Sequence, residues 1–194
     1  MSSQQPKKDT DVGKIEGWVE IEVRDKDGNI KYKIGTTPEK LFKKNNPVFP
    51  LASSFPAKET ELFYWRKNVI TDVGLACIIR LVFAGLTEDK FGYLGIGSGT
   101  TSEAVTDTAL QAEVARKSAT VSQETTSVSG DTAKLEATFS SADGLSGSMN
   151  ISEAGIFNAS TGGDLLARKV FSAVPVNWDA GDTLTIRYYV QMTR

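Results

Sequence analysis

The C-terminal half of the chain alternates apolar and polar residues in short runs that are separated by turn residues. A period of two places apolar side chains on one face of a strand, and regularly spaced short strands are typical of an antiparallel sandwich. We therefore expect a mainly β protein with a minor α component, built as an antiparallel β-sandwich. The expected strands are 119–128, 133–139, 149–157, 164–171 and 183–192, with turns at 129–131, 143–144, 161–163 and 179–181.

A β-hairpin is expected near the N-terminus. Val19, Ile21 and Val23 alternate with charged residues, residues 25–29 carry turn chemistry, and residues 30–34 alternate again. The Asp-Gly pair at 27–28 favours a tight hairpin turn. The Asp-x-Asp-x-Asn spacing at 25–29 is partly that of a calcium loop, but the glycine is misplaced and the loop's final Glu is missing. The hairpin turn is the favoured interpretation.

The hairpin lies between two stretches of irregular sequence. Residues 1–13 are polar, and residues 36–63 hold Pro38, Pro47, Pro50 and Pro56 among isolated apolar residues. Such a segment does not form a long element. It either laces subunits together or wraps the sheet of its own domain. We divide the chain into an N-terminal arm, 1–60, with the hairpin and the Pro-rich connector, and a sandwich assembly domain, 61–194, which we expect to fold without the arm.

Two short helices are expected in the assembly domain. Thr71 or Asp72 can cap a helix that continues to Gly85, and a second helix is expected over 106–116, with Leu110 and Val114 on one face. Between them, residues 91–96 indicate a buried strand and residues 97–99 a Gly-rich turn. The glycine spacing of that turn does not match a nucleotide-binding loop, and no Lys-Ser/Thr pair follows it.

The composition argues against most catalytic classes. The chain has no histidine, which removes the commonest general base and metal ligand. The one cysteine, Cys77, lies in an apolar run and is interpreted as a small buried hydrophobe. A carboxylate-pair enzyme stays open, because two positioned Asp or Glu residues suffice for glycoside hydrolysis. We expect no catalytic residue, no metal site and no cofactor.

The charge and hydropathy patterns argue against nucleic-acid and membrane partners. The chain carries 22 basic and 24 acidic residues, a net charge of −2, with no broad positive field. No run of apolar residues is long enough to span a bilayer, and the N-terminus lacks the apolar core of a secretion signal. We expect a protein made in the cytosol that does not enter a membrane.

Several motifs in one order resemble the attachment domain of phage tail-collar fibre proteins and related small virion proteins of tailed viruses. The resemblance covers about residues 69–194. Its motifs are Ile70-Thr71-Asp72-Val73-Gly74, the run Leu94 to Thr100, the run Thr108 to Arg116, Ile151 to Phe157, and Leu165-Leu166-Ala167-Arg168.

The resemblance implies a noncatalytic structural protein of the virion, assembled in the host cytoplasm. Its partners would be other virion proteins and copies of itself, in a trimer or ring. A fibre protein would continue into a long repetitive shaft, whereas this sequence ends at Arg194. We therefore expect an adaptor, collar or baseplate component.

The candidate site residues belong to these motifs and are expected to serve structure. Glu113 and Arg116 could pair on one face of the second helix, Arg116 could instead bind Glu153, or both could be solvated charges. Gly97 and Gly99 would form a tight turn, and Gly155 would permit a bulge or a close backbone approach. The full set is Thr71, Gly74, Gly97, Gly99, Thr108, Leu110, Glu113, Arg116, Glu153 and Gly155.

Three other functions stay open. A capsid decoration or vertex protein belongs to the same class. A carbohydrate-binding module for attachment to a host glycan would gather Trp18, Trp65 or Trp178 in a shallow groove. A glycan hydrolase would need two buried carboxylates in a cleft at catalytic separation.

Overall fold

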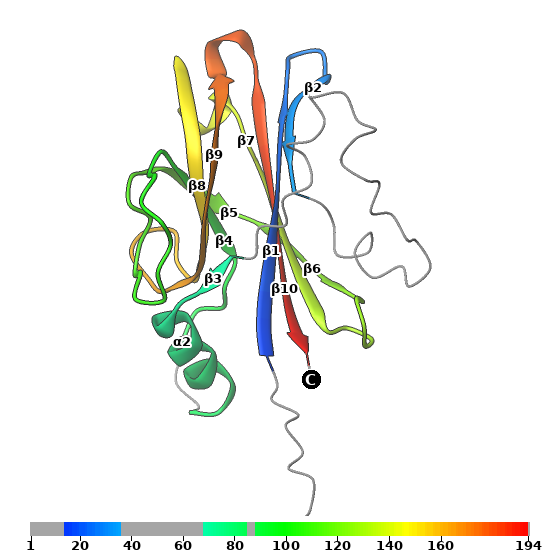
Figure 1. The fold of residues 1–194 in the computed structure, drawn as a ribbon, viewed down its shortest axis with the longest axis vertical. Coiled ribbons are helices and arrows are strands. Elements are labelled where there is room, and N and C mark those ends of the chain that lie inside the picture. Colours follow the sequence, from blue (N-terminus) through cyan, green and yellow to red (C-terminus); the bar gives the residue numbers. More distant parts are fainter. Residues whose placement is uncertain (1–13, 36–67, 85–87, 194) are drawn as a thin grey trace, which may run out of the picture.

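A computed structural model describes residues 14–35, 68–84 and 88–193, which form two five-stranded antiparallel sheets and one α-helix (Figure 1). The protein is mainly β, consistent with the expected sandwich. The strands are β1 (Lys14–Arg24), β2 (Ile30–Ile34), β3 (Val69–Ile70), β4 (Tyr93–Gly97), β5 (Glu113–Ser118), β6 (Thr120–Glu124), β7 (Thr132–Phe139), β8 (Ser148–Phe157), β9 (Leu165–Asn177) and β10 (Thr183–Thr193). The helix is α2 (Asp72–Val82), and two 3₁₀ turns, η2 (Ser141–Asp143) and η3 (Trp178–Ala180), follow β7 and β9.

The first sheet has the strand order β2-β1-β10-β7-β6. The expected hairpin is confirmed as β1 and β2, and Gly28 has the positive φ of 85° that its turn requires. One carboxylate oxygen of Asp25 accepts the backbone amides of Asp27 and Asn29, each at 2.9 Å. These contacts are those of an Asx-type turn.

The hairpin is joined to this sheet along the whole of β1. Every residue of β1 from Lys14 to Arg24 is paired with a residue of β10. Val19, Ile21 and Val23 are buried in the same core as side chains of the second sheet. The expected boundary near residue 60 therefore does not separate the hairpin from the assembly domain, because β1 supplies part of that domain's core. Residues 1–13 and the Pro-rich connector lie outside the described residues.

The second sheet has the order β3-β9-β8-β4-β5, and the main core lies between the two sheets. Leu94, Ile96, Ile151 and Ile156 from this sheet pack with residues of β1, β7 and β10. Tyr188 of β10 also crosses the core and donates a hydrogen bond from its hydroxyl to the Ala154 carbonyl at 2.7 Å. Burial raises the pKa of Tyr188 well above its usual value, so the hydroxyl stays protonated and able to donate.

Helix α2 begins where the sequence predicts. The Thr71 side chain accepts the Gly74 amide at 3.1 Å, as an N-cap does, and donates to the Leu165 carbonyl on β9. Gly74 faces β9 so closely that a Cβ there would lie 2.6 Å from the Leu166 Cα. The helix is capped by Phe83, and the expected end at Gly85 lies outside the described residues. None of the described helices is long and apolar enough to cross a membrane.

The second expected helix, over residues 106–116, is wrong. These residues form the end of a loop and strand β5, which pairs with β4. The amides of Gln111 and Ala112 bond to the carboxylate of Glu153 on β8, so they are not available for helical bonds to carbonyls four residues earlier. Two expected strands end at different residues in the structure. The strand expected over 119–128 stops at Glu124 as β6, and the strand expected over 164–171 continues to Asn177 as β9.

Candidate functional site

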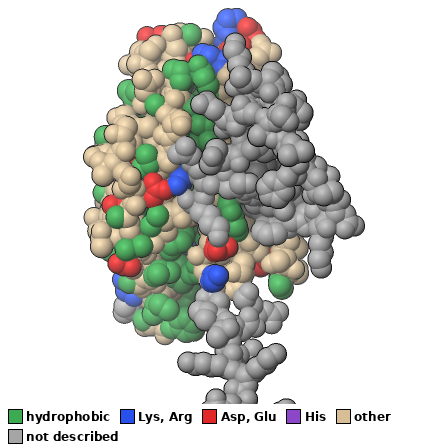
Figure 2. Space-filling view, viewed as in Figure 1, with side chains coloured by type: hydrophobic (Ala, Val, Ile, Leu, Met, Phe, Trp, Pro, Cys, Tyr) green, Lys and Arg blue, Asp and Glu red, His purple; other side chains and the backbone are tan. Residues whose placement is uncertain are grey.

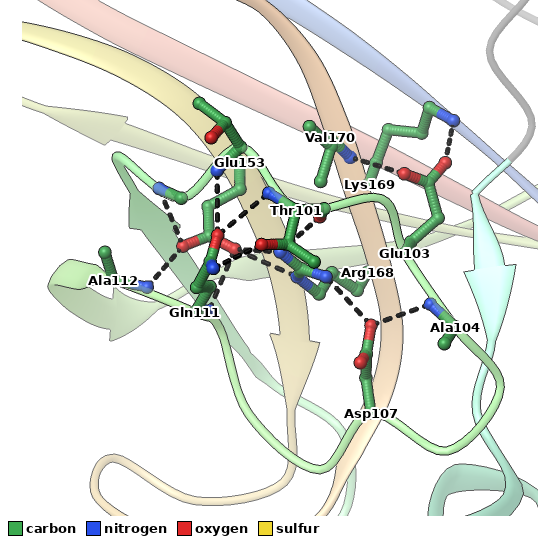
Figure 3. A network of polar contacts seen from close by, with 12 residues as sticks. Thr101, Glu103, Ala104, Asp107, Gln111, Ala112, Glu153, Arg168, Lys169 and Val170 are labelled. Atoms are coloured by element: carbon green, nitrogen blue, oxygen red, sulfur yellow. Dashed lines mark hydrogen bonds and ion pairs between the residues drawn. The ribbon is translucent and has the colours of Figure 1, made fainter.

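A network of polar contacts anchors the loop between β4 and β5 to the second sheet (Figure 3). We call residues 98–112 the β4–β5 loop. Figure 3 shows side chains from β8 and β9 pointing into the loop, while loop side chains point back toward the sheet. The network is therefore formed between the sheet and its own connection.

Glu153 is the centre of this network. Its side chain is fully buried, with 0% exposure. One carboxylate oxygen accepts the amides of Gly99 at 3.0 Å and Ala112 at 2.7 Å, and the other accepts the Gln111 amide at 3.0 Å. A carboxylate offers about four acceptor positions, and three of these are taken by loop amides. Glu153 thus supplies the hydrogen bonds that the loop backbone does not make with other backbone groups.

Arg168 neutralises Glu153. Its guanidinium, on the neighbouring strand β9 and 2% exposed, lies 2.8 Å from the second carboxylate oxygen. It also binds Asp107 at 2.9 Å and donates to the Thr101 carbonyl at 3.0 Å. Burial acts to lower the pKa of Arg168, but the carboxylates of Asp107 and Glu153 outweigh it and hold that pKa above its usual value. The charge of Arg168 is therefore permanent and fully engaged.

Two further contacts hold the loop at its edges. Gln111 accepts the amides of Thr100 and Thr101 at 2.9 Å each. Glu103 forms an ion pair with Lys169 of β9. Burial raises the pKa of Glu103, but the ammonium of Lys169 outweighs it and holds that pKa below its usual value. The Gln111 contacts thus join the two ends of the loop to each other, and the Glu103–Lys169 ion pair joins the loop to β9.

The glycines of the site leave room for Glu153. A Cβ on Gly97 would lie 2.6 Å from a Glu153 carboxylate oxygen, and one on Gly99 would lie 2.4 Å from the same oxygen. A Cβ on Gly155 would lie 2.8 Å from Leu165 Cδ1 and 3.0 Å from the Ala167 carbonyl oxygen. The Gly-rich turn therefore gives space to a buried carboxylate. The amides of Ser98 and Gly99, which a phosphate loop would present to its ligand, bond to the Ala112 carbonyl and to Glu153.

Glu113 and Arg116 pair on strand β5, and not on a helix. Their closest atoms are 2.6 Å apart, and Arg116 also donates to the carbonyls of Ala159 and Gly162. The guanidinium lies 3.4 Å from the centre of the Phe157 ring, a favourable cation–π geometry. The alternative that Arg116 binds Glu153 is wrong, because Arg168 occupies that position.

The other expected site residues divide between core and surface. Leu110 packs with Phe157 and Leu165 in a small second core. Thr71 and Gly74 join α2 to β9, as described above. Thr108 is exposed on the β4–β5 loop. The structure thus brings most of the predicted residues to one sheet and leaves Thr108 on the surface.

Sequence reasoning missed Arg168 and Asp107 as site residues. Arg168 is the last residue of the Leu165-Leu166-Ala167-Arg168 motif. A usable signal was the position of its charge inside the apolar run of β9, since a buried charge requires a partner. Asp107 carries no such signal, because an aspartate in a polar loop is ordinary.

A second polar cluster joins α2 to the loop after β8. The Cys77 sulfur and one carboxylate oxygen each from Glu88 and Asp164 lie within 4.8 Å of one another, close enough to share a metal ion. Arg80 already binds both carboxylates, Glu88 at 2.5 Å. Burial and the nearby carboxylates raise the pKa of the Cys77 thiol, which disfavours the thiolate that a metal needs. The cluster is therefore better described as an ion-pair network.

Two of the tryptophans and three of the buried carboxylates that the two alternative activities would use can be placed among the described residues. Trp18 is 6% exposed and Trp178 is 1% exposed, so neither offers an open face to a sugar, and Trp65 lies outside the described residues. Glu153 is saturated by amides and by Arg168. The buried Glu20 and Glu22 are engaged by Arg187, Lys33 and Arg24 across the outer side of the first sheet.

Comparisons with known protein families, with curated proteins and with solved structures find no match to this chain.

Proposed function

We propose that this chain is a noncatalytic structural protein of a tailed-virus particle, an adaptor, collar or baseplate component that works through protein–protein contacts. It acts with copies of itself and with other virion proteins, without a cofactor and without nucleic acid. The proposal rests on the resemblance of its motifs together with their arrangement in space.

The observation that carries the proposal is the convergence of these motifs. They come from five separate stretches of sequence, and all lie on the second sheet, on α2 or on the β4–β5 loop. Thr71 bonds to β9, and Glu153 of β8 bonds to the β4–β5 loop. Arg168 of β9 binds both Glu153 and Asp107 of that loop. The motifs thus form one continuous unit in space.

The chemistry of the network also favours a structural role. Its charged groups face one another and the loop backbone, and the Glu153 carboxylate is already engaged by three loop amides and by Arg168. What the network does accomplish is to fix a long exposed loop on a rigid sheet. Such a loop is a suitable contact surface for a neighbouring subunit.

The edge of the first sheet that β6 forms is also suited to contact with another protein. Strand β6 is one of the two edge strands of this sheet, with β2 at the other edge, and the first four residues of β6 are exposed. It has neither the lysine nor the proline that commonly protects an edge from pairing, and Val121 on it is 48% exposed. An unprotected edge is a site at which another protein can add a strand.

The test is the presence of the chain in purified particles. Particles of the virus that encodes it are banded, washed in salt and quantified by mass spectrometry, with an abundant host protein measured as the contaminant control. We expect a fixed copy number per particle, and fractionation of tails from capsids separates a tail component from a capsid decoration protein. Presence in the lysate with loss from washed particles would contradict the proposal.

A further inference from the structure

The sequence contains two Asp-Gly pairs, and both lie in tight turns. Asp27-Gly28 lies in the turn between β1 and β2, and Asp143-Gly144 lies at the end of η2. The two glycines have φ values of 85° and 81°. Each glycine amide donates to the carbonyl three residues earlier, at 3.0 Å and 3.1 Å. The backbone therefore treats the two pairs alike, and a difference between them must come from the surroundings of the aspartate carboxyl.

An Asp-Gly pair can react with its own backbone. The glycine nitrogen attacks the carboxyl carbon of the aspartate, a C–N bond forms, a C–O bond breaks, and one water leaves. The five-membered succinimide that results is opened by water at either carbonyl, which gives aspartate again or isoaspartate. Glycine favours the reaction because no side chain shields its nitrogen. The carboxyl must be neutral, since a carboxylate has no leaving group, and it must be free to turn onto that nitrogen.

The Asp143 carboxyl meets neither condition. It accepts the Ser140 amide at 2.9 Å and binds the ammonium of Lys117 on β5. That ammonium also donates to the Thr138 carbonyl at 3.0 Å, so it is itself fixed in place. Burial acts to raise the pKa of Asp143, but Lys117 and the Ser140 amide outweigh it and hold that pKa below its usual value. The carboxyl of Asp143 is thus both charged and immobile.

The Asp27 carboxyl is held far less firmly. It contacts the ammonium of the adjacent Lys26 at 2.9 Å, and the two side chains are 64% and 69% exposed. An exposed ion pair of this kind contributes little. Residues 26–29 are all exposed, and Figure 2 shows basic and acidic side chains at the upper end of the molecule, where Figure 1 places this turn. An exposed turn with few buried contacts opens at little cost in free energy.

We propose that Asp27 is a site of spontaneous isoaspartate formation in the folded protein, and that the contacts of Asp143 protect it from the same reaction. The reactants are the chain itself and water, so no enzyme and no cofactor take part. The inference concerns the chemistry of the hairpin turn and does not depend on the proposed function.

The modification would change the turn and leave the sheet in place. Isoaspartate carries the main chain through the former side chain and adds one carbon to the turn. The Asp25 carboxylate accepts the amides on both sides of Gly28, and Arg24 donates to the Gly28 carbonyl at 2.6 Å. The added carbon displaces these groups from their partners. Pairing of β1 with β10 continues to Arg24, so the rest of β1 stays bound.

The test is a peptide map of the aged full chain. The folded protein is kept for several weeks in warm, neutral buffer and digested with a protease that cleaves before aspartate and not before isoaspartate, with a fresh sample as the zero-time control. We expect cleavage before residue 27 to be lost progressively, while cleavage before residue 143 stays complete. Methyl transfer by an isoaspartate-specific methyltransferase locates the product independently. Asp27→Glu should abolish the signal, because glutamate would have to close a larger and less favourable ring.

A second variant tests the protection of Asp143. Lys117→Met removes the ammonium from Asp143, and isoaspartate should then appear at residue 143 as well, with circular dichroism as the check that the variant is folded. In urea both sites of the wild type should react, since the unfolded chain protects neither. No isoaspartate at residue 27 of the folded chain, or equal amounts at residues 27 and 143, would overturn the inference. A Lys117→Met variant that stays unmodified at residue 143 would refute the protective role of Lys117.

Discussion

The Glu153 carboxylate and the Arg168 guanidinium lie 2.8 Å apart on neighbouring strands, both almost wholly buried. They are not directly opposite, because Arg168 is in register with Gly155, so the arginine reaches diagonally across the glycine. This pair connects β8 and β9 to the β4–β5 loop. Separation of the pair is the most direct way to test what holds the loop.

Replacement of the arginine should be costly. Arg168→Met leaves the Glu153 charge buried without its counterion, and the free energy of unfolding should fall by about 3–5 kcal/mol. Lys26→Met removes an exposed ion pair with Asp27 and should cost at most about 1 kcal/mol. Urea unfolding followed by circular dichroism measures both changes. Equal effects in the two variants would refute the anchoring role of Arg168.

Gly74→Ala should destabilise the protein, against its usual effect in a helix. At an exposed helical position this change is favourable by about 1 kcal/mol. Here the new Cβ meets the β9 backbone at 2.6 Å, and overpacking of this kind costs about 1–3 kcal/mol. The control is Gly92→Ala, whose Cβ has its nearest neighbour at 3.8 Å. A stabilised Gly74→Ala variant in thermal unfolding would mean that α2 does not pack closely on β9.

The position of β1 predicts that its core residues stabilise the whole protein. Ile21 is fully buried between the sheets, so Ile21→Ala should cost about 2–5 kcal/mol. Ile30→Ala, on the exposed edge strand β2, should change the free energy of unfolding by about 0.5 kcal/mol or less. If the hairpin were an appended arm, Ile21→Ala would leave the main unfolding transition unchanged.

Stability should be lost in acid and hold steady near neutrality. Burial acts to raise the pKa of Glu22, Glu103, Asp131, Glu136 and Asp143, but hydrogen bonds and cationic neighbours outweigh it and lower each pKa. The unfolded chain, with ordinary values of 3.8 for Asp and 4.5 for Glu, then takes up protons first as the pH falls. The stabilisation is complete above about pH 5 and lost as the pH falls through the lowered values.

Between about pH 5 and 8 we expect little change, since the chain has no histidine. Urea unfolding at a series of pH values checks both regions. Asp131→Asn provides the internal control, because it removes one of the perturbed carboxyls and should weaken the acid dependence. A steep change in stability between about pH 5 and 8 would contradict this account.

The thiol of Cys77 should be unreactive in the folded protein. It is fully buried, and burial, with the carboxylates of Asp164 and Glu88, raises its pKa. A colorimetric thiol reagent should therefore react with it only on unfolding, while Val128→Cys, at a position 52% exposed, adds a thiol that reacts at once. Rapid modification of Cys77 in the native wild type would show that α2 opens readily.

Local patterns in the sequence predict much of this fold. Alternation over 133–139 and 149–157 corresponds closely to β7 and β8, and the Asp-Gly turn corresponds to the β1–β2 hairpin. The cap at Thr71 likewise appears where its side-chain chemistry places it. These features depend on neighbouring residues, so their physical cause is contained in a short stretch of chain.

Contacts between distant residues decide the rest. Residues 106–116 have a helical pattern, yet the Glu153 carboxylate, more than 40 residues away, takes the amides that a helix would need. Arg168 becomes the centre of a site only because Glu153 and Asp107 meet it in space. The place of β1 is likewise set by its pairing with β10, at the far end of the sequence. Sequence alone determined most of the strands and the start of α2. Tertiary structure decided that residues 113–118 form a strand and which strands are neighbours, because the burial of charges and backbone amides is settled only when the whole chain packs.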